Sequence, residues 1–309
     1  MAKRPLIAVV GATATGKSAA AAALAEALDG EVVSADAYQV YRGLDIGTAK
    51  AEPDLRARVP HHLLDIADPT DQLTLARFLD AAHDALEDVW SRGKLPVLAG
   101  GSGQYVWALL EGWNVPRVPP DAELRAELEA LAATAGNAAL LARLAEVDPE
   151  AAVRLDPENP RRLVRAIEVV VREGRPLAAC QTRSPIDADV FILGLRLQRE
   201  ELFARLDART DAMYAAGFLD EVRRLRDEGR GATAAVRGGV GYKEVSQHLD
   251  GQFDLEEAVR RHKNANHRLV RRQDAWFKPA DPRITWVNAA SDAASRCVDL
   301  ARQWLQANR

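Results

Sequence analysis

The chain contains Gly11-Ala12-Thr13-Ala14-Thr15-Gly16-Lys17-Ser18, which fits the pattern G-x-x-x-x-G-K-[ST] without a mismatch. An apolar run at residues 6–10 precedes it, and an Ala-rich helical stretch at 18–28 follows it. In such a strand–loop–helix context, the glycines let backbone amides converge on phosphate oxygens, and the helix N-terminus adds positive charge. Lys17 supplies a cation, and the Ser18 hydroxyl is able to ligate Mg²⁺. The stretch predicts a phosphate-binding loop, here called the phosphate loop, but it names no reaction.

Further strands are predicted at residues 31–36, 94–101, 190–195 and 284–287, with helical patterns between them. Strands that alternate with helices indicate a parallel sheet. We therefore predict an α/β fold: a P-loop NTPase-like parallel sheet covered by helices on both faces. Ligands of such sheets collect at the carboxyl ends of the strands, so the site is expected there.

Residues 116–187 show no strand pattern. Helical segments are predicted at 122–133, 138–146 and 161–171. We interpret this part as an inserted all-helical domain, and residues 1–115 and 188–309 as the core domain.

Composition excludes several protein classes. The 309 residues are 48% hydrophobic and 28% charged, which is typical of a globular protein and not of a disordered one. The longest apolar run has seven residues, 19–25, whereas a membrane span needs about 20. No signal peptide is recognisable at the N-terminus, and Cys180 and Cys297 match no disulfide or metal pattern. We expect a cytoplasmic protein with two buried thiols and no membrane segment.

Polar residues follow the second predicted strand. Asp36, at its end, has the position of a general base, a metal ligand or a substrate acceptor, although many such aspartates only cap a turn. The amide of Gln39 is able to read a base edge by hydrogen bonding, and the ring of Tyr38 or Tyr41 is able to stack on a base. For at least one of the tyrosines, packing in the protein interior is the alternative.

Two more glycine-rich stretches carry candidate residues. Gly100-Gly101-Ser102-Gly103 ends the third predicted strand, where many phosphate-loop NTPases hold a metal-binding acid; Ser102 either contacts substrate or caps the next helix. In the stretch Arg237-Gly238-Gly239-Val240-Gly241-Tyr242, Arg237 either neutralises a phosphate or lies on a plain surface loop.

The net charge of −4 hides two basic segments. Residues 258–278 hold seven Lys or Arg and one acid, and residues 161–175 hold five Arg and two Glu. Arg261, Arg268 and Arg272 fall on one helical face; they indicate either nucleic-acid phosphate contact or a solvated surface. The pair His61-His62 is interpreted as part of a loop rather than a metal site.

Taken together, these stretches resemble the tRNA dimethylallyltransferases (isopentenyl-tRNA transferases) over about residues 6–290. The resemblance adds Asp45-Ile46-Gly47-Thr48-Ala49-Lys50 and Arg271-Arg272-Gln273-x-x-Trp276-Phe277 to the motifs above. The bacterial type is the better match, because two unpaired cysteines cannot build the zinc finger of eukaryotic relatives.

The resemblance implies transfer of the five-carbon group of dimethylallyl diphosphate to N6 of the adenosine 3′-adjacent to the anticodon. The tRNAs would be those that read codons starting with U, diphosphate would be released, Mg²⁺ would be needed, and the enzyme would be a monomer. Asp36 would be the general base, Ser102 would contact the adenosine, and Lys17 and Arg237 would assist the leaving diphosphate, which residues 11–18 would hold. The implied contacts to the tRNA anticodon stem-loop are Asp36, Ala37, Tyr38, Gln39, Ser102, Arg161, Arg162, Leu163, Val164, Arg165, Arg237, Gly238, Gly239, Val240, Gly241, Tyr242, Arg261, Arg268 and Arg272.

Two positions depart from the family pattern. Ala37 stands where the family usually has Ser, and Ser102 where it usually has Thr. Three alternatives stay open: a phosphate-loop small-molecule kinase, an adenylate isopentenyltransferase acting on free AMP, and a tRNA-binding protein without catalysis.

Overall fold

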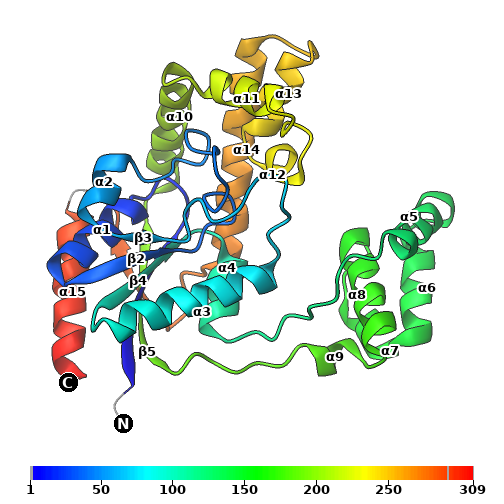
Figure 1. Cartoon of the computed structure of the whole chain (residues 1–309), viewed down its shortest axis with the longest axis horizontal. Helices are drawn as coiled ribbons and strands as arrows, with labels where there is room; N and C mark the ends of the chain where they lie inside the picture. Colours follow the sequence, from blue (N-terminus) through cyan, green and yellow to red (C-terminus); the bar gives the residue numbers. More distant parts are fainter. Residues whose placement is uncertain (1–2, 291, 309) are drawn as a thin grey trace. The chain divides into compact units, whose positions relative to one another are not determined.

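A parallel six-stranded sheet forms the centre of the computed structural model, which describes residues 3–290 and 292–308 (Figure 1). The strand order is β3-β2-β4-β1-β5-β6. Because every pair is parallel, the carboxyl ends of all the strands lie along one edge. The strands are β1 (Arg4–Gly11), β2 (Gly30–Ser34), β3 (His61–His62), β4 (Leu95–Gly100), β5 (Ala188–Arg196) and β6 (Ile284–Asn288).

Helices cover both faces of the sheet, as predicted. On one face, α1 (Lys17–Ala27) and α15 (Ala293–Ala307) pack over Ile7, Val9 and Val97. On the other face, α3 (Leu75–Ser91) packs against β2 and β4 (Figure 1). Successive strand residues point to opposite faces, so the continuous apolar run of β1 is buried under both helical layers.

The chain divides into two compact units. Unit 1 comprises Met1–Trp107 and Asp187–Arg309, and unit 2 comprises Ala108–Ile186. The sequence had suggested boundaries at 116 and 187. Helix α4 (Gly103–Leu110) runs across the first boundary.

Unit 1 carries a second group of helices beyond the sheet, α10 to α14 (Figure 1). The ring of Phe218 packs against those of both Tyr242 and His262 in its interior. The remaining helices of unit 1 are α2 (Pro53–Arg58), α10 (Arg199–Ala215), α11 (Phe218–Asp227), α12 (Ala234–Gly238), α13 (Tyr242–Leu249) and α14 (Leu255–Trp276).

Unit 2 is helical, with its own apolar core. Asp148 ties two of its helices together, because one carboxylate oxygen accepts from the amide of Ala151 at 3.0 Å and the other from the amide of Leu177 at 2.7 Å. Its helices are α5 (Ala122–Ala135), α6 (Asn137–Val147), α7 (Pro149–Arg154), α8 (Pro160–Glu173) and α9 (Leu177–Cys180).

Three local outcomes concern earlier predictions. His61 and His62 form the short edge strand β3 rather than a loop, and His62 Nε2 contacts Glu31 Oε2 at 2.6 Å; two paired residues are too few to leave a period in the sequence. Cys180 and Cys297 are buried free thiols, as expected. Within residues 3–290 and 292–308, no helix is both long and apolar enough to cross a membrane.

Candidate active site

The phosphate loop connects β1 to α1 and turns back on itself. Gly11 and Gly16 have φ values of 135° and 87°, in the region that favours glycine. The Thr15 hydroxyl donates to the carbonyl of Ala12 at 2.8 Å, and the Lys17 ammonium donates to the same carbonyl at 2.7 Å. The two glycine turns and these two donors hold Lys17 against the loop backbone.

Lys17 has a perturbed acidity. Burial lowers the pKa of its ammonium from 10.5 to about 8; the positive charge of Arg209 lowers it further, while the Asp36 carboxylate opposes the change. Loss of hydration and a neighbouring cation both disfavour the charged form. A bound anion would favour it, so the lysine is suited to a negatively charged ligand.

Asp36 lies two residues beyond the end of β2. Its Oδ1 accepts hydrogen bonds from the amides of Tyr38 at 2.8 Å and Gln39 at 3.2 Å. The amide of Ala37, which directly follows Asp36 in the chain, donates to the Ser102 hydroxyl oxygen at 3.2 Å. The carboxylate therefore both shapes its turn and lies beside the serine that follows β4, so the two turns form one wall.

The turn after β4 requires small residues. A Cβ on Gly100 would lie 2.3 Å from the carbonyl oxygen of Ala35, and one on Gly101 would lie 2.4 Å from the Gln273 amide nitrogen. Gln273 is only 8% exposed and bridges two loops: its Oε1 accepts from the Thr13 amide at 2.8 Å, and its Nε2 donates to the Gly101 carbonyl at 3.1 Å. One buried side chain thus joins the phosphate loop to the Ser102 turn.

Replacing Gln273 by glutamate tests this bridge. The new carboxylate still accepts from the Thr13 amide, but its second oxygen faces the Gly101 carbonyl without a donor. An unpaired buried acceptor costs about 1–3 kcal/mol, so we expect the free energy of unfolding in urea to fall by that amount. An unchanged unfolding midpoint would show that the bridge contributes nothing to stability.

A cavity of about 470 Å³ lies where these turns meet, at the carboxyl edge of the sheet. This is the position predicted for a ligand of a parallel sheet. The predicted site residues that line it are Thr13, Ala14, Gly16, Lys17, Ser18, Asp36, Tyr38, Gln39, Ser102, Gly238, Gly239, Val240, Tyr242 and Arg272. The predicted site residues that do not line it are Gly11, Ala12, Thr15, Ala37, Arg161, Arg162, Leu163, Val164, Arg165, Arg237, Gly241, Arg261 and Arg268.

Comparisons with known proteins agree with this geometry. Residues 39–280 match the family model described as IPP transferase, and residues 5–58 match that described as isopentenyl transferase. The chain belongs to the IPP transferase family. A tRNA dimethylallyltransferase of Roseiflexus sp. (strain RS-1) is 46% identical over 98% of this chain and 99% of its own length. That of Dehalococcoides mccartyi is 37% identical over 97% of this chain and 93% of its own length.

Solved structures of the IPP transferase family share the fold. The crystal structure of the tRNA isopentenylpyrophosphate transferase from Bacillus halodurans matches 99% of this chain and 97% of its own, with a TM-score of 0.73 and 36% identity. A solved structure of a eukaryotic dimethylallyltransferase acting on tRNA matches 98% of this chain and 80% of its own chain, with a TM-score of 0.82. Because the two sequences are only 24% identical, this match supports the fold alone. The matches do not favour the kinase alternative.

Sequence reasoning missed several residues that line the cavity of this IPP transferase. They come from α10 and from the buried side of α14: Arg205, Arg209, Met213, His262, Asn266, Leu269 and Gln273. Asn266 donates to the Thr210 hydroxyl at 3.1 Å, which ties α14 to α10. No local motif marks the α10 residues, because α10 lies almost two hundred residues beyond the phosphate loop and joins it only in the folded chain. Gln273 lies in the stretch 271–277 that the resemblance includes, but that stretch did not predict a role for its side chain.

Arg237 occupies a different place from the one its motif implied. It is exposed on α12 and does not line the cavity, although the next three residues, Gly238 to Val240, do. Its assistance to a leaving diphosphate stays a prediction.

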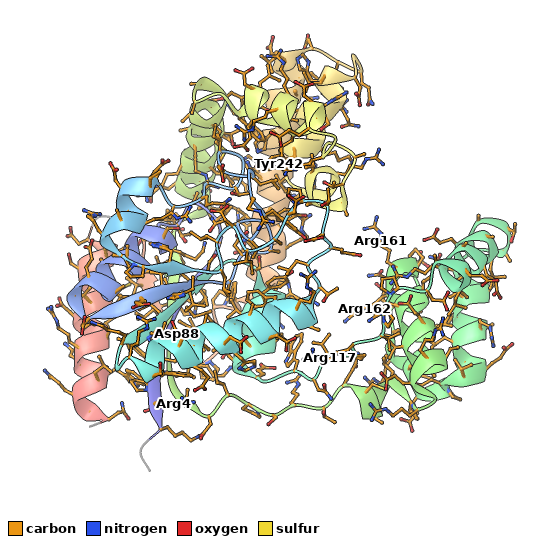
Figure 2. The ribbon with its side chains drawn as sticks, in the orientation of Figure 1. Arg4, Asp88, Arg117, Arg161, Arg162 and Tyr242 are labelled. Carbon is orange, nitrogen blue, oxygen red and sulfur yellow. The ribbon has the colours of Figure 1, made fainter. Side chains whose placement is uncertain are left out.

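Tyr242 lines the cavity but is only 1% exposed. Its hydroxyl donates to Glu221 Oε1 at 2.6 Å, and the same carboxylate accepts from the amides of Asp45, Ile46 and Gly47 at 3.1, 2.8 and 3.2 Å. A Cβ on Gly47 would lie 2.6 Å from the tyrosine ring. The motif at residues 45–50 is therefore anchored on Glu221 and packed against Tyr242 (labelled in Figure 2).

Removing this hydroxyl gives a stability test. In Tyr242→Phe, the buried carboxylate of Glu221 loses the shortest of its hydrogen bonds. Hydrogen bonds to charged groups contribute about 1.5–3 kcal/mol, so we expect the free energy of unfolding in urea to fall within that range. A variant as stable as the wild type would contradict this anchoring role.

The arginines predicted on α8 of unit 2 have unlike surroundings. Arg161 and Arg162 are exposed at its start and form no ion pair within the described part of the chain (Figure 2). Leu163 and Val164 are buried in the unit's core. Arg165 is paired with the buried carboxylate of Glu168. The first two arginines are thus available for an external ligand, whereas the rest of the stretch builds the helix.

The arginines of helix α14 also divide into those paired with an acid and those without an acidic partner. Arg261 is 48% exposed, pairs with Glu257 at 2.7 Å and lies over the Phe253 ring. Arg268 and Arg272 are exposed, and no acid pairs with either among the described residues. Arg272 also reaches the cavity, where its charge acts on Tyr38.

Proposed function

We propose that this chain transfers the dimethylallyl group from dimethylallyl diphosphate to N6 of the adenosine 3′-adjacent to the anticodon, in tRNAs that read codons starting with U. Diphosphate is released. The main observation in support of this reaction is that one cavity is lined by the phosphate loop, Asp36 and Ser102. It brings a site for an anionic leaving group next to a carboxylate that is suited to take a proton. The names and sequences of the relatives support the same reaction.

Asp36 and Ser102 serve the acceptor side of the reaction. The N6 lone pair of adenine is delocalised into the ring, so the amine needs positioning and a base. The Asp36 carboxylate takes the N6 proton, since only its Oδ1 is engaged by Tyr38 and Gln39 among the described residues. The Ser102 oxygen accepts from the Ala37 amide, which leaves its O–H to donate to the adenosine.

The donor side fits a Mg²⁺ ion shared with the substrate. Ser18 is exposed in the cavity at the start of α1, and the described residues contain no cluster of three or more His, Cys, Asp or Glu side chains. Mg²⁺ is commonly held by one or two protein ligands together with substrate phosphates. Ser18 would hold such an ion, which would offset the negative charge of the diphosphate as it leaves the dimethylallyl group.

Unpaired arginines support contact with the tRNA backbone. Arg268 and Arg272 have no acidic partner among the described residues, while Arg260 of the same helix forms a bidentate pair with Glu257. Phosphate contacts of this kind orient a nucleic acid without reading its sequence. We assign α14 and the first arginines of α8 to the anticodon stem-loop.

Charge reversal tests the contact of α14. In the triple variant Arg261→Glu, Arg268→Glu, Arg272→Glu, we expect tRNA affinity to fall and the slope of log affinity against log salt to flatten by about 0.7–0.9 for each lost phosphate contact. Filter binding at several salt concentrations measures both. The matched control reverses Arg58, Arg223 and Arg302, which are exposed outside the predicted sites. An identical slope in both triple variants would show that α14 does not contact the tRNA backbone and is an ordinary solvated surface.

The reaction itself is tested with labelled dimethylallyl diphosphate, Mg²⁺ and unmodified tRNA carrying adenosine 3′ of the anticodon. We expect label in the tRNA and equimolar diphosphate in solution. Label on free AMP in place of tRNA, or phosphate release from ATP without prenyl transfer, would refute the proposal. A tRNA substrate with that adenosine replaced by guanosine is the matched control and should stay unlabelled.

A further inference from the structure

The turn at residues 45–50 belongs to the family resemblance, yet the proposed reaction gives it no role so far. Its carbonyls at Thr48 and Ala49 accept hydrogen bonds from the side-chain nitrogen of Gln39, Nε2, at 3.1 and 3.3 Å. Gln39, Thr48 and Ala49 all line the cavity that contains Asp36. The turn is therefore the direct partner of a polar side chain in the site.

These contacts fix which end of the Gln39 amide is available to a ligand. Nε2 carries two hydrogens and donates to two carbonyls, while Oε1 accepts from the buried Ser34 hydroxyl at 3.4 Å. Rotating the amide by half a turn would place its oxygen beside two carbonyl oxygens and would lose both of these hydrogen bonds. An amide oxygen accepts two hydrogen bonds, so Oε1 keeps one free position. Gln39 thus offers the cavity an acceptor.

A buried carboxylate on α11 holds this turn from the other side. Glu221 is only 3% exposed, and its two oxygens accept from the amides of residues 45, 46 and 47 and from the Tyr242 hydroxyl. A carboxylate has about four acceptor positions, so these donors satisfy Glu221 within the protein. Any contribution of Glu221 to the reaction must therefore be indirect, through the turn that it holds.

The far end of the turn is also fixed. The buried ammonium of Lys50 pairs with Asp45 and Asp65, each at 2.6 Å. Ala49 has a φ of 50°, in the left-handed region that a residue with a side chain rarely adopts. A backbone strained in this way persists only where the surrounding contacts hold it. The positions of the Thr48 and Ala49 carbonyls therefore depend on the contacts at both ends of the turn.

We propose that Glu221 is a positioning residue for the acceptor base: it holds the turn at 45–50, whose carbonyls orient the Gln39 amide so that Oε1 accepts a hydrogen from the amino group of the target adenine. This inference rests on the proposed function and deepens it. In the transfer step, the N6 lone pair forms a bond to the allylic carbon, and the electron pair of the broken carbon–oxygen bond leaves with the diphosphate. One N6 hydrogen passes to Asp36 as a proton. The other stays on N6, where Gln39 accepts it before and after transfer.

This orientation gives the site a preference among purines. Adenine presents an amino donor where guanine presents a carbonyl oxygen. Guanine would bring a second acceptor against Oε1, and a purine without a substituent there would leave Oε1 without that partner. The contact selects for the amino group only while the turn keeps the amide in this orientation.

The test compares two anticodon stem-loop RNAs that differ only at the nucleotide 3′ of the anticodon. One carries adenosine and the other purine riboside, which lacks the amino group. Filter binding without dimethylallyl diphosphate keeps the transfer step out of the measurement. In Gln39→Met, which keeps the side-chain length but removes the acceptor, we expect the preference for adenosine to fall about 2- to 10-fold. In Glu221→Gln, where an amide nitrogen replaces one acceptor oxygen, we expect a smaller fall in the same direction.

The ratio of the two affinities separates positioning from a loss of stability, because unfolded protein weakens the binding of both RNAs equally. Asp220→Asn is the matched control, since Asp220 is the exposed neighbour of Glu221 on α11. Asp148→Asn is the destabilised control, because it removes a buried acceptor from the core of unit 2. Both controls should retain the wild-type ratio.

A wild-type ratio in Gln39→Met overturns the proposal, as does a wild-type chain that binds both RNAs equally. A wild-type ratio in folded Glu221→Gln overturns the positioning role of Glu221. If Glu221→Gln does not fold by circular dichroism, Glu221→Asp, whose carboxylate is one methylene shorter, replaces it under the same criterion. A chain that prefers adenosine and shows the expected falls, but labels no tRNA, retains the positioning role while the proposed function fails.

Discussion

Replacing Asp36 by asparagine is expected to slow prenyl transfer to tRNA by about 10²- to 10⁴-fold, the usual contribution of a positioned general base. Asparagine retains the Oδ1 acceptor that holds the amides of Tyr38 and Gln39, so the turn after β2 keeps its shape. It cannot take the N6 proton. The rate is measured under single-turnover conditions with enzyme in excess over labelled donor, and tRNA affinity is measured by filter binding.

Affinity for tRNA should stay at the wild-type level, because the arginines of α14 are untouched. Asp84→Asn is the matched control: Asp84 is exposed on α3 and lies outside the cavity, so its variant should transfer the prenyl group normally. A wild-type rate in folded Asp36→Asn would remove Asp36 from the role of base. Equal loss of rate and tRNA affinity would instead make it a tRNA-positioning residue.

The parts that sequence could predict are local in the chain. The phosphate loop and its flanking strand and helix lie within residues 4–27, so the motif, the apolar run and the Ala-rich stretch all point to the same structure. The ends of β2 and β4 were visible for the same reason, since each buried strand is followed by a polar or glycine-rich turn. Parallel topology then placed Asp36 and Ser102 at one edge without further information.

The rest of the site depends on contacts between distant segments. Hydrophobic periodicity places Val259, His262, Leu269 and Trp276 on one face of α14, yet Trp276 is 40% exposed while the polar Asn266 and Gln273 are buried. These two are buried because each finds partners on other segments, Thr210 on α10 and the loops at Thr13 and Gly101. A pattern of apolar residues contains no information about such partners. For the same reason, the sequence did not predict Arg209 as a site residue.

Removing the charge of Lys17 is expected to have the second large effect. In Lys17→Met, affinity for dimethylallyl diphosphate should fall roughly 10²-fold, because a charge-assisted hydrogen bond and a Coulombic attraction are lost together. The ammonium donates to the Ala12 carbonyl, and we expect phosphate contacts to replace that bond when the donor binds. Calorimetric titration measures the affinity, and unchanged binding would exclude Lys17 from the anion site.

The pH dependence of binding provides a second, independent measure of the same group. The free enzyme holds Lys17 with a pKa of about 8, below the ordinary 10.5, and a bound diphosphate raises that pKa because it favours the ammonium. Binding therefore takes up a proton above pH 8, and affinity should decline as pH rises beyond that value, by at most tenfold per unit. Lys17→Arg stays charged over this range, so its profile should lack the decline. If both proteins lose affinity in parallel, the titrating group is not Lys17 but belongs to the ligand or to another residue.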